Sequence, residues 1–150
     1  MVRNLSVSEM LDADFVRATG LFRYRHYQTL KLGKKLKYII FKFSPDNKEI
    51  ITEKTSESDN YEDFIADLPE DQCRYAVYDF QYEKEGGGQR NKVCFFLWNP
   101  DAASVRSRML TASSKDALKK SFDGIHFDIQ GSDLSEVSYE NVLEKASKSF

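Results

Sequence analysis

Few side chains in this 150-residue sequence have the types and spacing that catalysis or metal binding requires. Neither of its two histidines, His26 and His126, lies beside a serine or cysteine nucleophile motif such as GxSxG. The two cysteines, Cys73 and Cys94, lie in apolar runs without a CxxC pair, which favours reduced, buried thiols over a zinc site. We therefore expect no catalytic residue, no metal and no cofactor, and a binding protein rather than an enzyme.

A carboxylate cluster and a glycine run are also better explained by ordinary structure. Asp59, Glu62 and Asp63 do not follow the twelve-residue calcium-loop pattern with its central glycine, so they indicate a solvated face. Residues 86–88 are three glycines between two predicted strands, whereas a phosphate-binding loop leads from a strand into a helix. We expect a flexible hairpin tip at these glycines.

Charge is segregated along the chain, although the net charge is only −2. Residues 1–37 carry eight basic and three acidic side chains, residues 46–71 carry two basic and ten acidic, and residues 90–120 carry seven basic and two acidic. The near-neutral total excludes a generally basic nucleic-acid-binding protein. A basic stretch of this density indicates a surface for an acidic partner, with a solvated helix face as the alternative.

Two arginines in the last basic stretch fall on a predicted helix. Arg106 and Arg108 flank Ser107, and two residues on a helix are about 200° apart. Both arginines therefore cannot share the stripe that Val105 and Met109 form at helical spacing. We expect one arginine to extend along the inner rim of the helix and the other to project outward.

The remaining basic residues of interest form three further groups. Lys115, Lys119 and Lys120 lie about one turn apart and form a basic ridge. Arg90 and Lys92 lie on one face of a strand after the glycine run. The last helix carries Glu144, Lys145 and Lys148. Arginine, exposed methionine and mixed charge together are typical of a protein–protein interface.

The predicted elements that position these residues alternate between strands and helices. Aromatic and β-branched runs predict strands over residues 36–43, 49–53, 73–82 and 92–98. Capping residues and apolar spacing predict helices over residues 6–15, 60–68 and 135–148, and a helix from residue 100 that is interrupted at 113–116 and ends at 124. This order predicts an α/β protein of the α+β type, with a central mixed β-sheet flanked on both faces by helices.

The length predicts one domain over residues 1–150, because single domains commonly have about 100–200 residues. No internal repeat or linker is evident. No apolar run approaches the roughly 18 residues of a membrane span, and the first residues lack the apolar core of a secretory signal.

Several motifs in register resemble the actin-depolymerising factor/cofilin family. They are LKLGKKLKYI at residues 30–39, CRYAVYDF at 73–80, WNPD at 98–101, VRSRM at 105–109, ASSKDALKK at 112–120 and QGSDLSE at 130–136. The likeness extends from about Tyr27 to the C-terminus without large gaps. It implies the ADF-homology (cofilin-like) fold as a single domain over residues 1–150, with residues 1–20 as an atypical N-terminal extension that can be flexible.

The resemblance implies a protein that binds ADP-actin monomers and filaments and severs and depolymerises the filaments, thereby controlling actin turnover. It implies a monomer that works in the cytoplasm and cytoskeleton, with the nucleus as a further location. The monomer site, shared with filament binding, maps to Arg106, Arg108, Met109, Lys115 and Asp116. The filament site maps to Arg90, Lys92, Glu144, Lys145 and Lys148. Phosphoinositide headgroups, a further partner of the family, would contact Lys115, Lys119 and Lys120.

Two alternatives remain beside this interpretation. A relative of the same fold could act on branched-filament nucleating complexes, which loss of Met109 or of the basic pair at residues 90 and 92 would have favoured; both are present. A phosphoinositide-regulated binding scaffold is the other alternative.

The N-terminal region departs from the family pattern. Family members begin with a serine followed by Gly-Val, where this chain has residues 15–17, Phe-Val-Arg, preceded by further residues. Control through phosphorylation of an N-terminal serine is therefore left open, although Ser6 and Ser8 are present.

Overall fold

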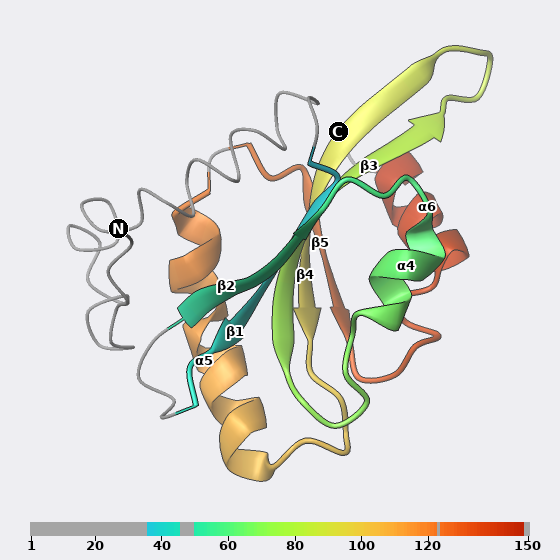
Figure 1. The fold of residues 1–150 in the computed structure, drawn as a ribbon. Helices are drawn as coiled ribbons and strands as arrows, with labels where there is room; N and C mark the ends of the chain where they lie inside the picture. The colour runs from blue at the N-terminus through green and yellow to red at the C-terminus, as the bar shows by residue number, and fades with distance from the viewer. Residues whose placement is uncertain (1–35, 46–49, 123, 149–150) are drawn as a thin grey trace.

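The computed structural model describes residues 36–45, 50–122 and 124–148. In chain order the described elements are β1 (Tyr38–Phe43), β2 (Ile50–Ser56), α4 (Tyr61–Ala66), β3 (Arg74–Glu83), β4 (Gln89–Trp98), α5 (Val105–Lys120), β5 (Phe127–Gly131) and α6 (Tyr139–Lys148) (Figure 1). The helix expected over residues 6–15, the N-terminal extension at 1–20 and His26 lie outside the described residues.

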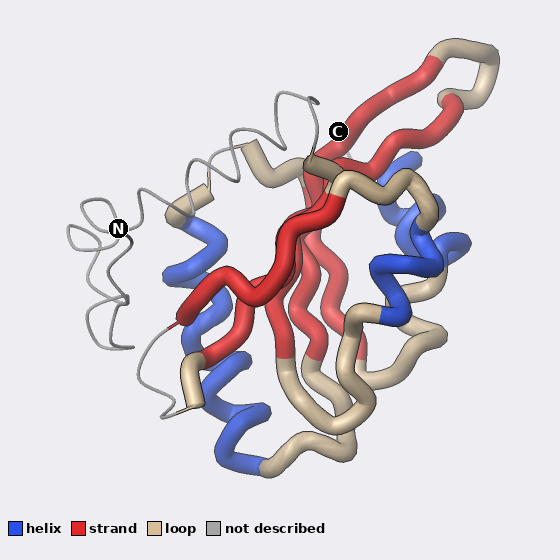
Figure 2. Tube along the Cα trace, in the orientation of Figure 1, coloured by secondary structure: helices blue, strands red, loops and turns tan. Residues whose placement is uncertain are grey.

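The sheet has five strands in the order β2-β1-β3-β4-β5. All neighbouring pairs are antiparallel except β4 and β5, which run parallel. A parallel pair needs a crossover connection, and here α5 supplies it. Helix α5 covers one face of the sheet, and α4 and α6 cover the other (Figures 1 and 2). The predicted α+β fold with a mixed sheet and helices on both faces is confirmed.

Strand β4 shows why one part of the sequence is almost wholly apolar. Its residues alternate between two cores: Cys94 and Phe96 belong to the core with α4 and α6, and Val93 and Phe95 belong to the core with α5. A central strand that is covered on both faces needs apolar side chains at every position, because each face excludes water. Burying each phenylalanine contributes about 1.5–3 kcal/mol.

The three glycines at residues 86–88 form the tip of the β3–β4 hairpin, as predicted. All three have a φ of +91° to +99°, a conformation that side chains disfavour. The backbone N–H of Lys84 donates to the carbonyl oxygen of Gly88 at 2.8 Å and closes the turn. The hairpin projects beyond the helices that cover the sheet (Figure 1).

Strand β5 and the continuity of α5 differ from the predictions. Residues 127–131 form a short edge strand that we did not predict, because its two buried apolar side chains, Phe127 and Ile129, give too weak an alternation. Helix α5 runs through residues 113–116 without the interruption that we expected. The hydroxyl of Ser113 donates to the carbonyl oxygen of Leu110 at 3.0 Å, so this serine bonds within the helix instead of capping a new one.

Helix α6 begins at Tyr139, four residues later than the predicted start at 135. The preceding segment is a turn in which the carboxylate of Asp133 accepts hydrogen bonds from the backbone N–H groups of Ser135 and Glu136, at 2.9 and 3.2 Å. Aspartate in a turn uses the same bonds that cap a helix, which explains why the sequence pattern placed the start too early.

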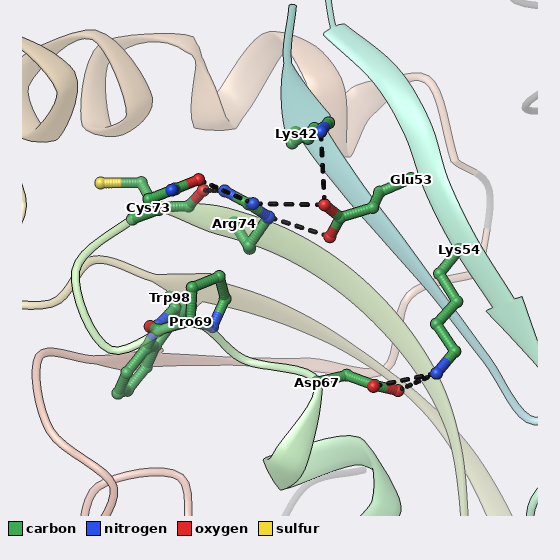
Figure 3. Close-up of polar contacts among 9 residues, drawn as sticks. Lys42, Glu53, Lys54, Asp67, Pro69, Cys73, Arg74 and Trp98 are labelled. Atoms are coloured by element: carbon green, nitrogen blue, oxygen red, sulfur yellow. Dashed lines mark hydrogen bonds and ion pairs between the residues drawn. The ribbon is translucent and has the colours of Figure 1, made fainter.

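An ion-pair network fixes the edge strand β2 to the centre of the sheet (Figure 3). The guanidinium of Arg74 on β3 contacts both carboxylate oxygens of Glu53 on β2, at 3.0 and 3.2 Å. The ammonium of Lys42 on β1 lies 3.4 Å from the same carboxylate. Burial raises the pKa of Glu53, but the hydrogen bond and charge of Arg74 outweigh it, so the pKa is lowered.

Three further polar contacts fix α4 and the segment after it; Figure 3 draws Lys54, Asp67, Pro69 and Trp98. The carboxylate of Asp67 binds the ammonium of Lys54 at 2.8 Å and accepts a hydrogen bond from the hydroxyl of Tyr38. The indole N–H of Trp98 donates to the carbonyl oxygen of Pro69 at 2.6 Å.

Among the described helices, none has the length and apolar composition to cross a membrane.

Candidate functional site

Helix α5 presents an exposed apolar stripe to solvent. Val105 is 72% exposed and Met109 is 67% exposed, and Ala112 is also exposed. Helical spacing groups Val105 with Met109 on one stripe, and the exposed methionine expected from the sequence is found there. The stripe is unpartnered among the described residues, and exposed apolar side chains beside charges are typical of a binding surface.

The inner face of α5 uses small polar residues and one leucine instead. Thr111, Ser114 and Leu118 are the buried residues of the helix. The hydroxyl of Tyr75, on the underlying strand β3, donates to the carbonyl oxygen of Thr111 at 2.6 Å. Because the strand side chains beneath α5 are large, the helix needs small residues to pack closely. The distribution of apolar residues along α5 therefore does not show which face of the helix is buried.

The two arginines of α5 have different surroundings, as the 200° separation predicted. Arg106 is exposed and has no hydrogen bond or ion pair with any described residue. Arg108 is half-buried: its Nε donates to the side-chain oxygen of Asn99 at 3.2 Å, and its Nη2 lies 3.2 Å from the carboxylate of Asp101. Arg108 is therefore the arginine on the inner rim, and Arg106 projects outward.

The lysine ridge farther along α5 is partly neutralised by strand β5. The ammonium of Lys115 lies 2.9 Å from one carboxylate oxygen of Asp128, and that of Lys119 lies 3.6 Å from the other. Burial raises the pKa of Asp128, but the hydrogen bond from Lys115 and the nearby lysine charges outweigh it and lower the pKa. Lys120 and Asp116 are exposed. Of the three ridge lysines, Lys120 thus retains the most accessible charge.

Arg90 and Lys92 lie on one face of β4, as predicted, but only Arg90 is exposed. Lys92 is 7% exposed, and its ammonium donates to the carbonyl oxygen of Ala146 in α6 at 2.8 Å. The ammonium also lies 5.8 Å from the centre of the Tyr82 ring. Lys92 has the same parity along β4 as Cys94, whose side chain faces the core that α6 covers. Its cation therefore stabilises the negative C-terminal end of α6.

The three predicted charges of α6 are all exposed. Glu144 and Lys148 form an ion pair of 2.8 Å along the helix, and the hydrogen bond from Lys148 lowers the pKa of Glu144. Lys145 lies between them on the chain. Exposed pairs of this kind contribute little to folding, so these charges remain available to a partner.

Helices α5 and α6, which carry most of the predicted residues, lie on opposite sides of the sheet (Figures 1 and 2), so these residues fall into two groups that we treat as candidate surfaces. The first, which we call the α5 surface, comprises Arg106, Arg108, Met109, Lys115 and Asp116. The second, which we call the hairpin–α6 surface, comprises Arg90, Lys92, Glu144, Lys145 and Lys148. Helix α5 and helix α6 pack against different faces of the sheet, and the bond from Lys92 to Ala146 joins β4 to α6.

Sequence reasoning missed the partners that hold these side chains. Asn99 and Asp101 lie in the WNPD motif beside α5, so their proximity to Arg108 had a weak signal in the chain. Asp128 lies in a strand that we did not predict. The carbonyl oxygen of Ala146 has no side-chain signature at all, because every residue carries one.

Neither cysteine points to chemistry at these surfaces. Cys73 and Cys94 are buried free thiols, as predicted. Burial raises the pKa of Cys94 well above its ordinary value, which keeps it protonated and unreactive. In the part of the chain that the structure describes, no cluster of three or more histidine, cysteine or acidic side chains could hold a metal ion.

Comparisons with known proteins agree with this arrangement. A family model described as "Cofilin/tropomyosin-type actin-binding protein" matches residues 24–147. The chain is 56% identical over 123 residues to cofilin of Mycosarcoma maydis, covering 82% of this chain and 88% of the relative. It is 50% identical over 123 residues to cofilin of Saccharomyces cerevisiae, covering 81% and 86%.

Similarity to solved structures extends the match to three dimensions. The crystal structure of Streptomyces griseoflavus cofilin superimposes with a TM-score of 0.80 and 54% sequence identity, covering 85% of this chain and 94% of that one. The family model runs from before β1 to residue 147 in the last turn of α6, so it includes the described sheet and every residue of the two surfaces except Lys148. This chain therefore belongs to the cofilin/tropomyosin-type family of actin-binding proteins.

Proposed function

We propose that this protein binds ADP-actin monomers and actin filaments, severs and depolymerises the filaments, and thereby controls actin turnover. Membership of an actin-binding family and about 50–56% identity to proteins named cofilin support the actin-binding and depolymerising role. The observation that carries the finer proposal is the presence of two charged surfaces on opposite layers of the sheet. A protein that contacts two neighbouring filament subunits needs two such surfaces.

The α5 surface serves the actin monomer in this proposal. Val105 and Met109 supply an exposed apolar centre, and Arg106 and Arg108 supply cations beside it. An apolar centre with a charged rim is the usual composition of a protein interface, and arginines are frequent hot spots there. Lys115 and Asp116 extend the same surface one to two turns along the helix.

The hairpin–α6 surface serves the second actin subunit of the filament. Arg90 on the hairpin arm and Lys145 and Lys148 on α6 are its exposed cations. Lys92 supports this surface from beneath, since it is buried and bonded to the end of α6. Filament binding thus depends on a surface that monomer binding does not use.

The proposed mechanism involves no covalent chemistry. A protein that binds a twisted filament state more tightly than the ordinary state shifts the filament toward the twisted state. The shift is limited by the difference between the two affinities. Contacts between neighbouring subunits are weakened in that state, and severing follows.

Phosphoinositide binding and cellular location are finer parts of the same proposal. Lys115, Lys119 and Lys120 would bind headgroup phosphates, since a lysine ammonium acts as a point charge toward phosphate. Lys120 is the most accessible of them, because Lys115 and Lys119 contact Asp128. We place the protein, as a monomer, at the actin cytoskeleton of the cytoplasm, with the nucleus as a further location.

The proposal is tested by three measurements on one preparation of the full chain. Co-sedimentation measures filament binding, a fluorescence titration measures affinity for ADP-actin monomers, and microscopy of single filaments measures severing. We expect all three activities. A chain that binds neither actin form contradicts the proposal, whereas binding without severing contradicts only the proposed mechanism.

A further inference from the structure

Asn99, between the end of β4 and the start of α5, has a side chain that neither surface includes. The residue is 7% exposed. Its backbone N–H donates to the carbonyl oxygen of Gly131 at the end of β5, at 2.9 Å. The neighbouring Trp98 is anchored through its indole N–H to Pro69. The main chain at Asn99 is therefore held from two sides, which fixes the position of its side chain.

Both ends of the Asn99 amide bind partners. The side-chain oxygen accepts hydrogen bonds from the Nε of Arg108 at 3.2 Å and from the thiol of Cys73 at 3.3 Å. The side-chain nitrogen donates to the backbone carbonyl oxygen of Arg108 at 3.3 Å. This pattern defines the orientation of the amide, because the flipped amide would place its N–H groups against the donor of Arg108.

Arg108 is thereby held at both its backbone and its guanidinium. Its Nη2 contacts Asp101 at 3.2 Å, and among the described residues its Nη1 has no partner. A guanidinium has five N–H donors, so binding Asn99 and Asp101 leaves donors directed away from them. Arg106, two residues earlier on the same helix, has no such support within the described part of the chain.

We infer that Asn99 is a positioning residue that fixes the guanidinium of Arg108 in the orientation that binds actin. The inference rests on the proposed function, in which Arg108 contacts the actin monomer. A free arginine loses side-chain entropy when an interface immobilises it, and an arginine that is already held loses less. Asn99 thus raises affinity without touching the partner.

A double-mutant cycle on ADP-actin monomer binding tests this role. The full-length variants are Asn99→Ala, Arg108→Ala and the two combined. We expect Asn99→Ala to raise the Kd about two- to tenfold, and to have no effect when Arg108 is already alanine. Coupling of this kind is the signature of a residue that acts through another, and a merely structural role would not produce it.

Ser104→Ala is the matched control, because Ser104 caps the start of α5 through a 3.2 Å bond to the backbone N–H of Ser107. It loosens the same end of the helix without changing the partners of Arg108. We expect it to lower the Tm and leave the Kd within twofold of the unmodified protein. If Ser104→Ala weakens binding as much as Asn99→Ala, Asn99 acts only on the helix and the inference is overturned.

The outcomes also separate this inference from the proposed function. If Arg108→Ala leaves the Kd unchanged, the proposed role of Arg108 at the monomer site fails. If Arg108→Ala weakens binding and Asn99→Ala weakens it equally with or without Arg108, the positioning role alone is overturned. Asn99→Ser, which keeps a small polar group, replaces Asn99→Ala if the alanine variant does not fold, with the same expected coupling.

Discussion

The α5 surface and the hairpin–α6 surface carry similar charges but are built in different ways. The α5 surface lies on one helix, so the directions of its arginines and Met109 relative to one another are set as soon as that helix forms. The hairpin–α6 surface joins residues that are more than 50 positions apart, through the bond from Lys92 to Ala146. One surface is local in the chain, and the other exists only in the folded protein.

Because of this difference, replacing a lysine or arginine should have different effects at the α5 surface and at the hairpin–α6 surface. On α5 the cations are at least partly exposed, so we expect the sheet to stay intact when they are removed. On the hairpin–α6 surface one cation is buried under the helix that it stabilises, so its removal alters the fold as well as the charge. Mutations of the cations on α5 should therefore weaken binding alone. Mutation of the buried Lys92 should weaken binding by lowering the stability of the fold.

The largest effect is expected at the local surface. Arg106→Ala combined with Arg108→Ala should abolish monomer and filament binding, since two hot-spot arginines each contribute about 2–4 kcal/mol. The Tm should stay within a few degrees, because neither side chain is in a core. Co-sedimentation, monomer titration and calorimetry check this expectation. If the double variant co-sediments with filaments as the unmodified protein does, the α5 surface is not part of the actin interface.

The next largest effect is expected at Lys92. Lys92→Met keeps the apolar stem but loses the hydrogen bond to Ala146, which contributes about 1.5–3 kcal/mol when the donor is charged. The Tm should fall by about 3–10 °C for a chain of this length. Amide hydrogen exchange should increase in the last turn of α6, and filament binding should fall while ADP-monomer binding stays near that of the unmodified protein.

Arg90→Ala is the matched control for Lys92→Met, because it lies two residues away on the same face of β4. It should weaken filament binding without changing the Tm or the monomer affinity. If both variants weaken filament binding and neither lowers the Tm, Lys92 is a direct contact and the contrast between the two surfaces disappears. Loss of monomer binding in Arg90→Ala would contradict the assignment of two separate surfaces.

A smaller effect is expected at Asp128, which restrains two lysines of α5. Because its pKa is lowered in the folded protein, its stabilising contribution is present above the ordinary aspartate pKa and is lost as the pH falls through the lowered value. Asp128→Asn should cost about 0.5–1 kcal/mol at pH 7. The difference from the unmodified protein should vanish at more acidic pH, which urea unfolding at several pH values measures.

Asp128→Asn also tests how much of the lysine charge on α5 is available to a phosphoinositide. With Asp128 neutral, Lys115 and Lys119 lose their carboxylate partner, so binding to vesicles that contain a phosphoinositide should become tighter by a few-fold. Vesicles with only zwitterionic lipid are the control. Equal binding of the two proteins to the phosphoinositide vesicles would show that these lysines do not contact the headgroup.

The smallest effect is expected at the exposed pair on α6. Glu144→Gln breaks the bond to Lys148, but both side chains are mostly exposed, so the Tm should not change measurably. Filament affinity should change less than in Arg90→Ala. A fall in Tm comparable to that of Lys92→Met would mean that α6 is held by its surface charges instead of the buried lysine.

The strands and the fold class could be predicted because the sheet imposes its pattern directly on the side chains. Residues 93–98 of β4 are apolar on both faces, and residues 75–78 of β3 are apolar and buried, which marks both as central strands. Strand β5 could not be predicted because an edge strand with two buried apolar residues resembles a loop. The buried face of α5 could not be predicted because it carries Thr111 and Ser114, which hydropathy does not mark as core.

Some features of the candidate site could likewise be predicted from the sequence, and others could not. The sequence by itself determined the family, through motifs in register, and the positions of the charges on α5, because helical spacing fixes which side chains share a face. Only the tertiary structure decided that Lys92 is buried against Ala146, that Asn99 holds Arg108 while Arg106 is unsupported, and that Asp128 neutralises two lysines. These contacts join separate elements, and the bond from Lys92 to Ala146 uses a main-chain oxygen. Since every residue carries such an oxygen, side-chain type alone gives no signal of the contact until the chain has folded.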